Sequence, residues 1–189
     1  MTAHGIAGEI LHLSVPTPTV ETAAQALGVQ PEQIVKSILF LVEAGLVGAG
    51  LRRALPSEVV GADPCVCPST SGRVSSLALP SPVLAIACGT AYIERRHIAA
   101  RYGVGRKRVR LASPEEVLAI SGYKVGGMPP FGHRQPLPTL LDRRVLDLSE
   151  AFAGGGEENA IVRLDPRDIA RFTSAGVMDL TAMPDQENE

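Results

Sequence analysis

Two glycines closely followed by two prolines mark the stretch of this sequence best suited to hold a ligand. The segment Gly122–Gly132 reads GYKVGGMPPFG, with Gly126 and Gly127 adjacent and Pro129 and Pro130 just behind them. Glycine lets the main chain approach a ligand closely, and proline stiffens the chain that follows. Exposed backbone N–H groups in such a loop suit an anionic or carbonyl-bearing ligand, such as the sugar-phosphate end of a nucleic acid. A tight structural turn is the alternative, because Gly and Pro mark turns more often than sites.

A second candidate is the lysine inside the apolar segment IVKSILFLVE, residues 34–43. An ammonium group surrounded by Ile, Val and Leu is costly to bury unless it finds a partner, a cavity or solvent. Lysine is also scarce in this chain, where Lys36, Lys107 and Lys124 are the only three. The alternative is that the stem of Lys36 packs against apolar neighbours while its head reaches water.

Basic residues gather in one segment of a nearly neutral chain. The formal net charge is −2, which argues against strong, indiscriminate nucleic-acid binding. Between Arg95 and Arg110, however, there are seven basic residues, enough to contact a few phosphates with salt-sensitive affinity. A solvated helix face joined to a charged strand edge explains the same residues equally well.

Several other chemistries find no support in the sequence. The three cysteines, Cys65, Cys67 and Cys88, form no disulfide framework, and the C-x-C pair lacks partners at zinc-ligand spacing. No GxGxxG follows a strand and no GxxxxGK[ST] occurs, which disfavours nucleotide hydrolysis. We therefore expect no metal and no cofactor. Without a signal peptide or an apolar run of about 20 residues, we expect a soluble, cytoplasmic protein with no membrane association.

The elements that position these residues alternate without a strict βαβ repeat. Thr19 suits the N-cap of a helix that ends at Gly28, and Ser113 begins a helix in capping-box fashion. We expect further helices over residues 93–103 and 166–173, and strands over residues 34–43, 82–89, 107–113, 150–156 and 160–164, with another ending at Asp142. The pattern predicts an α+β fold with a mixed, barrel-like β-sheet flanked by helices.

The length of 189 residues fits a single domain spanning residues 1–189. The Gly- and Pro-rich stretch from about residue 46 to residue 82 breaks the pattern, and we interpret it as an insertion that contains a possible strand, RVSSLAL. Residues 1–18 are weakly periodic, and their pattern is compatible with either a short helix or a strand.

Six segments in this order resemble the YbaK/ProX family, the domain related to the editing insertion of bacterial prolyl-tRNA synthetase. They are TVETAAQALGV, PEQIVKSILF, VRLASPEEV, SGYKVGGMPP, LLDRRVL and GGGEENAIVRLDP. The resemblance implies a mixed β-barrel with surrounding helices that hydrolyses misacylated tRNA without a metal. Lys36 falls on the family's lysine that holds the substrate end, and Gly126–Pro130 falls on its G-x-x-x-P loop.

From this resemblance we expect Lys36, Gly126 and Gly127 to carry catalysis, the glycines through N–H donors aimed at an oxyanion. The expected substrate-binding residues are Thr19, Met128, Pro129, Pro130, His133 and Asn159. The expected substrate is Ala- or Cys-tRNA(Pro), cleaved in trans, with prolyl-tRNA synthetase as a possible partner. The alternative function is a non-catalytic module that binds a tRNA end, a nucleotide or a synthetase. The sequence gives no oligomeric state.

Overall fold

A computed structural model describes residues 8–43, 80–89 and 91–182 of the chain. The predicted insertion therefore lies mostly outside the described residues, together with the possible strand RVSSLAL, Cys65 and Cys67. At its predicted end, Ser81 and Pro82 belong to a strand that is paired along its whole length. No helix among the described residues has the length and apolar character needed to cross a membrane.

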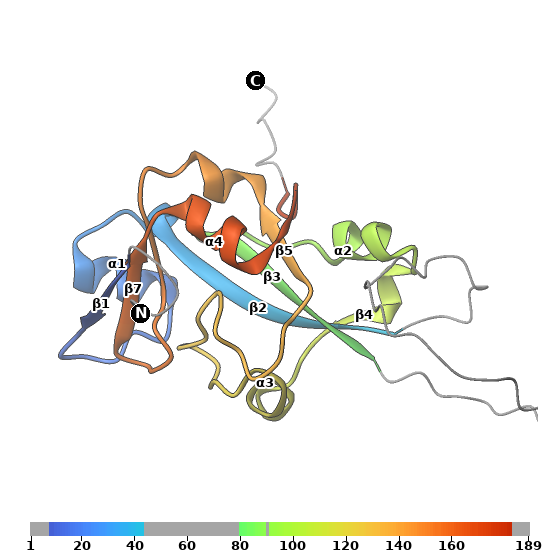
Figure 1. The fold of residues 1–189 in the computed structure, drawn as a ribbon, viewed down its shortest axis with the longest axis horizontal. Helices are drawn as coiled ribbons and strands as arrows, with labels where there is room; N and C mark the ends of the chain where they lie inside the picture. Colours follow the sequence, from blue (N-terminus) through green and yellow to red (C-terminus); the bar gives the residue numbers. More distant parts are fainter. Residues whose placement is uncertain (1–7, 44–79, 90, 183–189) are drawn as a thin grey trace, which may run out of the picture.

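One mixed sheet contains all eight strands that the structure describes (Figure 1). The strands run in the order β1-β7-β6-β2-β3-β5-β8, and β4 pairs with β2. Neighbours are parallel in the pairs β2/β6, β3/β5 and β5/β8 and antiparallel in the others. The bounds are β1 Glu9–His12, β2 Ile34–Val42, β3 Ser81–Cys88, β4 Val109–Leu111, β5 Thr139–Asp142, β6 Ala151–Gly154, β7 Ala160–Leu164 and β8 Gly176–Met178.

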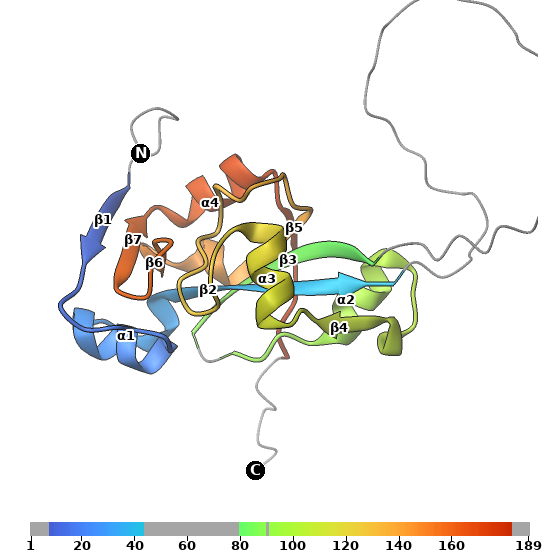
Figure 2. The ribbon, with the colours of Figure 1, turned by 90° about the horizontal axis from the view of Figure 1, so that it is seen from below.

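Four α-helices flank this sheet in the described residues: α1 Val20–Leu27, α2 Arg95–Tyr102, α3 Pro114–Ser121 and α4 Pro166–Thr173. Figures 1 and 2 show α1 beside β1 at one end of the molecule and α2 beside β4 at the other. The predicted α+β fold with a mixed sheet and flanking helices is confirmed. The sheet is not closed within the described residues, because its end strands β1 and β8 do not pair with each other.

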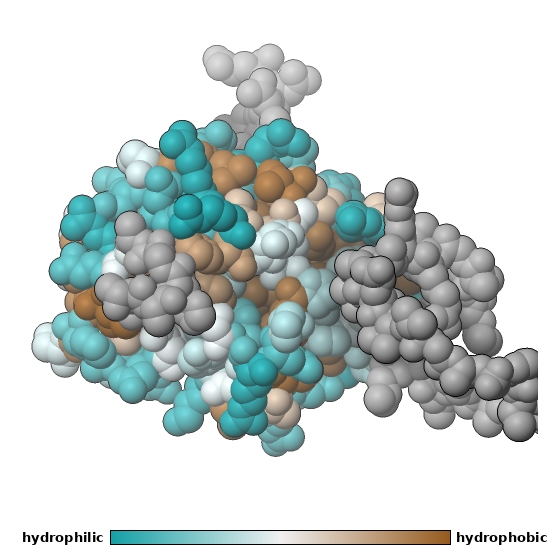
Figure 3. Space-filling view, viewed as in Figure 1, coloured by the Kyte–Doolittle hydropathy of each residue, from teal (hydrophilic) through white to brown (hydrophobic). Residues whose placement is uncertain are grey.

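The long strand β2 runs through the middle of the sheet and contributes to the core on both of its faces. Because side chains alternate along a strand, Val35, Leu39 and Leu41 join one apolar cluster with residues of α3 and α4. On the opposite face, Phe40 packs in a cluster with α2, and Ile34 packs with α1. On the outer surface, apolar residues show in separate areas among hydrophilic ones (Figure 3).

The predicted helix boundaries agree with the observed caps. Thr19 accepts a hydrogen bond from the N–H of Thr22, and Ser113 accepts one from the N–H of Glu116, so both capping boxes form. Gly28 and Gly122 close these helices at positive φ. Helix α2 begins at Arg95, two residues later than predicted, because Ile93 forms a β-bridge with Thr181 instead.

Two strands at the ends of the sheet were poorly marked in the sequence. Residues 1–18 left a helix or a strand open, and Glu9–His12 forms β1, which pairs with β7. No pattern predicted β8, whose three residues pair in parallel with β5. Such short strands are defined by a distant partner rather than by local periodicity.

Asp142, at the end of β5, fixes the segment that follows β8. Its carboxylate is 1 % exposed and accepts hydrogen bonds from the N–H groups of Leu180 and Thr181 and from the Thr181 hydroxyl, each 2.9 Å long. The N–H of Arg144 donates a fourth bond of 3.0 Å. A buried carboxylate with four donors is satisfied as a structural anchor.

Candidate active site

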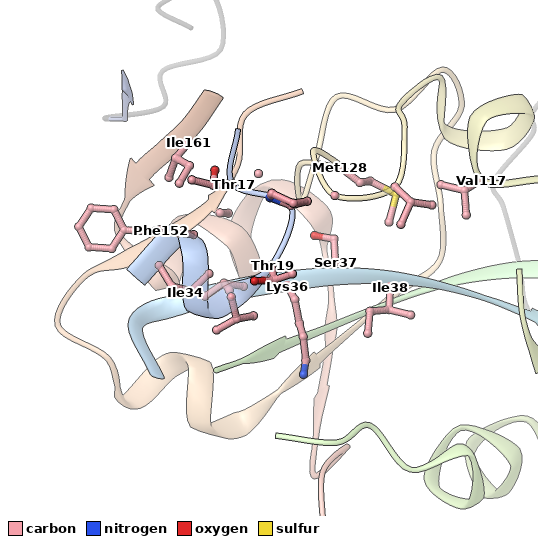
Figure 4. A pocket seen from close by; sticks show the side chains of 18 of the residues that line it. Thr17, Thr19, Ile34, Lys36, Ser37, Ile38, Val117, Met128, Phe152 and Ile161 are labelled. Carbon is pink, nitrogen blue, oxygen red and sulfur yellow. The ribbon is translucent and has the colours of Figure 1, made fainter. Parts of the chain in front are cut away.

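A cavity of about 470 Å³ opens beside the first half of β2. Its wall combines segments that are far apart in the sequence, as Figure 4 shows. The lining includes the start of α1, β2 from Ile34 to Leu39, Val117 of α3, the loop residues Val125, Gly126 and Met128, and parts of β6 and β7. A cavity of this size suits a small organic ligand or the end of a larger one.

A break in the sheet makes room for this cavity. On the edge away from β3, strand β2 pairs with β6 only at Ile34 and Val35. Pairing with β4 starts at Phe40. The intervening residues of β2, from Lys36 to Leu39, all line the cavity. The site therefore lies along the edge of β2 between the residues that pair with β6 and those that pair with β4.

Lys36 is half-buried in the wall of this cavity. Burial lowers the pKa of its ammonium below the usual value, while the charges of Cys88 and Glu21 act in the opposite direction. Side chains of consecutive strand residues point to opposite faces, so Lys36 and Ser37 diverge. Figure 4 shows the Lys36 side chain extending from β2 to the side away from Ser37 and Met128.

The glycine-proline loop reaches the cavity through Gly126 and Met128. Gly126 is exposed and has a φ of +99°. A Cβ added to it would lie 3.5 Å from the Cα of Pro18. Met128 is 7 % exposed, and its side chain forms part of the cavity wall. Lys36 and the loop thus line one cavity, as expected, but they approach it from different faces of β2.

Gly127 supports the loop and does not line the cavity. Its N–H donates to the carbonyl of Lys124 at 3.3 Å, and its carbonyl accepts from the N–H of Gly156 at 2.8 Å. A Cβ on Gly127 would lie 2.8 Å from the main-chain carbonyl of Glu157. The expectation that Gly127 supplies a free N–H donor is therefore wrong for this conformation. Within the described residues, the N–H of Gly126 has no acceptor and remains the candidate donor.

The turn between β6 and β7, residues 154–159, holds this loop against the chain that precedes α1. Thr17 donates from both its N–H and its hydroxyl to the carbonyl of Glu158. Asn159 donates from its side-chain amide to the carbonyl of Leu13 at 3.3 Å. The substrate contact expected of Asn159 stays a prediction, and in this structure its amide ties the turn to the chain that precedes α1.

Pro129 and Pro130 of the loop, and His133 just after it, do not line the cavity. Both prolines are buried, and Nε2 of His133 lies 3.0 Å from the carbonyl oxygen of Pro129. The ring of Tyr123 meets that of His133 edge-on, with centroids 6.0 Å apart. Burial lowers the pKa of His133. These contacts give His133 a role in bracing the loop.

Thr19 lines the cavity as the N-cap of α1. Its hydroxyl is engaged with the main chain and side chain of Thr22. Glu21, in the first turn of the same helix, also lines the cavity, and hydrogen bonds with its own main chain and with Thr19 lower its pKa. The mouth of the cavity near α1 is therefore polar.

Sequence reasoning missed Ser37. This residue lines the cavity, and its Oγ is buried without a hydrogen-bond partner in the described structure. Its position directly after Lys36 was the only available signal, because a serine in a strand carries no periodic signature.

The basic segment is partly neutralised by its own neighbours. Arg96 pairs with Glu94 at 2.6 Å, and Arg110 forms a bidentate pair with Glu116. Arg101 and Lys107 are exposed and have no carboxylate within 4 Å among the described residues. Strand β4 continues from this segment into Leu111, which lines the cavity, so Arg110 is the basic residue of the segment that directly precedes the lining.

Comparison with known proteins identifies the class to which this fold and cavity belong. A family model described as the aminoacyl-tRNA editing domain matches residues 76–172, just over half of the chain. The chain belongs to this family, and the resemblance drawn from the six sequence segments is confirmed. The matched range contains the glycine-proline loop, whereas Lys36 precedes it.

Individual relatives are similar over most of the chain. YwhH of Bacillus subtilis, whose function is uncharacterized, is 24% identical over 169 residues, 89% of this chain and 83% of that protein. EbsC of Enterococcus faecalis, named as a candidate Cys-tRNA(Pro)/Cys-tRNA(Cys) deacylase, is 25% identical over 100 residues, 53% of this chain and 60% of that protein.

Two solved structures share the fold. A candidate trans-editing enzyme for prolyl-tRNA synthetase superimposes with a TM-score of 0.68 at 28% identity, covering 93% of this chain and 87% of the other. The hypothetical protein APE2540 gives a TM-score of 0.71 at 25% identity, with 95% of both chains covered.

Proposed function

We propose that this protein hydrolyses the ester bond of misacylated tRNA in trans and releases a wrongly attached small amino acid. The substrates proposed are Ala- and Cys-tRNA(Pro). The observation that carries the proposal is the single cavity in which Lys36, the Gly126–Met128 segment and the unpaired stretch of β2 meet. Family membership supports tRNA as the macromolecule whose end enters it.

The chemistry requires a water molecule and a stabilised oxyanion. Water attacks the ester carbonyl carbon, the bond to the ribose oxygen breaks, and that oxygen takes a proton as the amino acid leaves. The free N–H of Gly126 would donate to the oxygen of the tetrahedral intermediate. The second expected donor, Gly127, instead fixes the position of Gly126 through its bonds to Lys124 and Gly156.

Lys36 would bind the substrate rather than attack it. Because its side chain extends away from Met128, its ammonium is better placed for a phosphate or ribose oxygen than for the oxyanion beside Gly126. Charge-assisted hydrogen bonds of this kind favour a phosphate, and the lowered pKa of Lys36 reflects the burial that would strengthen them.

Substituting Lys36→Met tests this assignment, because it removes the charge and keeps most of the stem. We expect kcat/KM for deacylation to fall about 10- to 100-fold, the equivalent of one lost hydrogen bond to a charged group. Tm should not fall, since burial already disfavours the ammonium in the folded state. Arg167→Met, at an exposed position of α4, is the charge-matched control. An unchanged rate for Lys36→Met on several misacylated tRNAs would refute the assignment.

A non-catalytic binding module is the second candidate. The observation that favours it is chemical: the cavity lining contains no His, Cys or Asp, and its one carboxylate, Glu21, is already hydrogen-bonded with its own main chain and with Thr19. This function predicts that the pure protein binds charged tRNA without releasing amino acid. Multiple turnovers at low protein concentration would exclude it. Prolyl-tRNA synthetase is the proposed partner, because the similar trans-editing candidate is described as acting for that enzyme.

A further inference from the structure

Ser37 has an unusual position for a serine. Its Oγ is buried and has no hydrogen-bond partner in the described structure. A buried hydroxyl normally finds a partner, because losing its bonds to water without replacement is costly. Such an atom at the wall of a cavity is a candidate for contact with a ligand.

The main chain of Ser37 is also left unpaired. The N–H of Gly89 donates to the carbonyl of Ile34. Because alternate residues of a strand bond to the same neighbour, the register between β2 and β3 means that Ile34, Lys36 and Ile38 direct their N–H and C=O groups toward β3. Ser37 therefore directs its own groups to the opposite edge. There, the ladder to β6 ends at Val35 and the ladder to β4 begins at Phe40. Three polar groups of one residue consequently face the gap that forms the cavity.

The surroundings of the Ser37 side chain are otherwise apolar. Val35 and Leu39, which share its face of β2, belong to a cluster that also contains Met128, Val117 and Ala112. Figure 4 shows Ser37 and Met128 on the same side of β2, with Lys36 on the other. This side of the cavity is thus a small apolar compartment with one isolated hydroxyl.

We propose that this compartment receives the aminoacyl group, and that Ser37 selects substrates whose side chain carries a hydroxyl or thiol. The unpaired hydroxyl of Ser37 would bond to that group, and its unpaired main chain would bond to the rest of the aminoacyl moiety. A site that presents a buried polar group disfavours an analogue that leaves the group unpaired. The inference rests on the proposed deacylase function and narrows it: Cys- and Ser-charged tRNA are preferred over Ala-charged tRNA.

The test compares single-turnover deacylation of Cys-, Ser- and Ala-tRNA(Pro) by the intact chain and by Ser37→Ala. We expect the unchanged protein to favour the cysteinyl and seryl substrates about tenfold or more. In Ser37→Ala, these two rates should fall to the rate that the same variant shows with the alanyl substrate, so that the order of preference disappears. Ser37→Thr keeps a hydroxyl and should keep the order of preference.

A structural role for Ser37 predicts different results. Since the hydroxyl has no partner in the fold, its removal should leave Tm unchanged or higher. A lower Tm with equal losses on all three substrates would overturn the inference, and so would a Ser37→Ala variant that keeps its preference. If the unchanged protein hydrolyses none of the three substrates, both the proposed deacylase function and the role of Ser37 are refuted. If it hydrolyses them without the expected selectivity, only the role of Ser37 is refuted.

Discussion

Substituting Gly127→Ala probes how tightly the glycine-proline loop is held. The added Cβ would lie 2.8 Å from both the main-chain carbon and oxygen of the Glu157 carbonyl, whereas an ordinary contact is at least 3.4 Å. Both sides of this contact are main chain, so no side chain can rotate to relieve it. The loop must move away from the turn, which strains the 2.8 Å bond from Gly156 to Gly127.

Overpacking of this kind typically costs about 1–3 kcal/mol. For a chain of this size, about 2–4 °C of Tm is lost per kcal/mol, so thermal unfolding should shift down by about 2–12 °C. Displacement of Gly126 should also lower the deacylation rate by about tenfold or more, because misplaced catalytic groups are costly.

Gly176→Ala provides the matched control, since Gly176 lies in β8, and an added Cβ there would make only ordinary contacts, 3.5 Å from the Leu140 side chain and 3.9 Å from the Thr139 carbonyl oxygen. Its Tm and rate should stay near those of the unchanged protein. Calorimetry measures Tm of both variants, and single-turnover assays measure their deacylation rates. A Gly127→Ala variant indistinguishable from Gly176→Ala in both measurements would show that the loop is not fixed by this contact.

Two further predictions concern stability. Asp142→Ala leaves four donors without their buried acceptor. The free energy of unfolding should therefore fall by at least about 3 kcal/mol, and Tm in a thermal melt by about 6–12 °C. A loss below about 1 kcal/mol would contradict the anchoring role. Glu116 has its pKa lowered from 4.5 to about 2, first by hydrogen bonds from Arg110 and then by the N–H of Ser113. Its contribution to stability is therefore complete above pH 4.5 and disappears as the pH falls toward 2. Tm measured against pH should converge for the unchanged protein and Glu116→Gln over this interval, and two curves that stay parallel down to pH 2 would refute the assignment.

Local chemistry in the sequence was enough to predict most helices and central strands. Thr19 and Ser113 cap helices because their side chains bond to N–H groups only two or three residues away. The apolar run around Lys36 predicts β2 because a strand buried on both faces needs apolar residues throughout. The family resemblance also singled out Lys36 and the glycine-proline loop, which both line the cavity but lie on different sides of β2.

Tertiary structure alone decided what each residue at the cavity contacts. The main chain of Ser37 is unpaired because two ladders on the same edge of β2 stop short of it, and where those ladders end depends on β4 and β6, which lie far along the chain. Gly127 packs against the turn that follows β6, and its N–H donates to the carbonyl of Lys124 within the same loop. Asn159 donates to the carbonyl of Leu13, which is far away in the sequence, whereas His133 lies beside the carbonyl of Pro129 in its own loop. Composition and spacing specify which residues are available for chemistry, whereas pairing between distant segments determines which polar groups remain free to perform it.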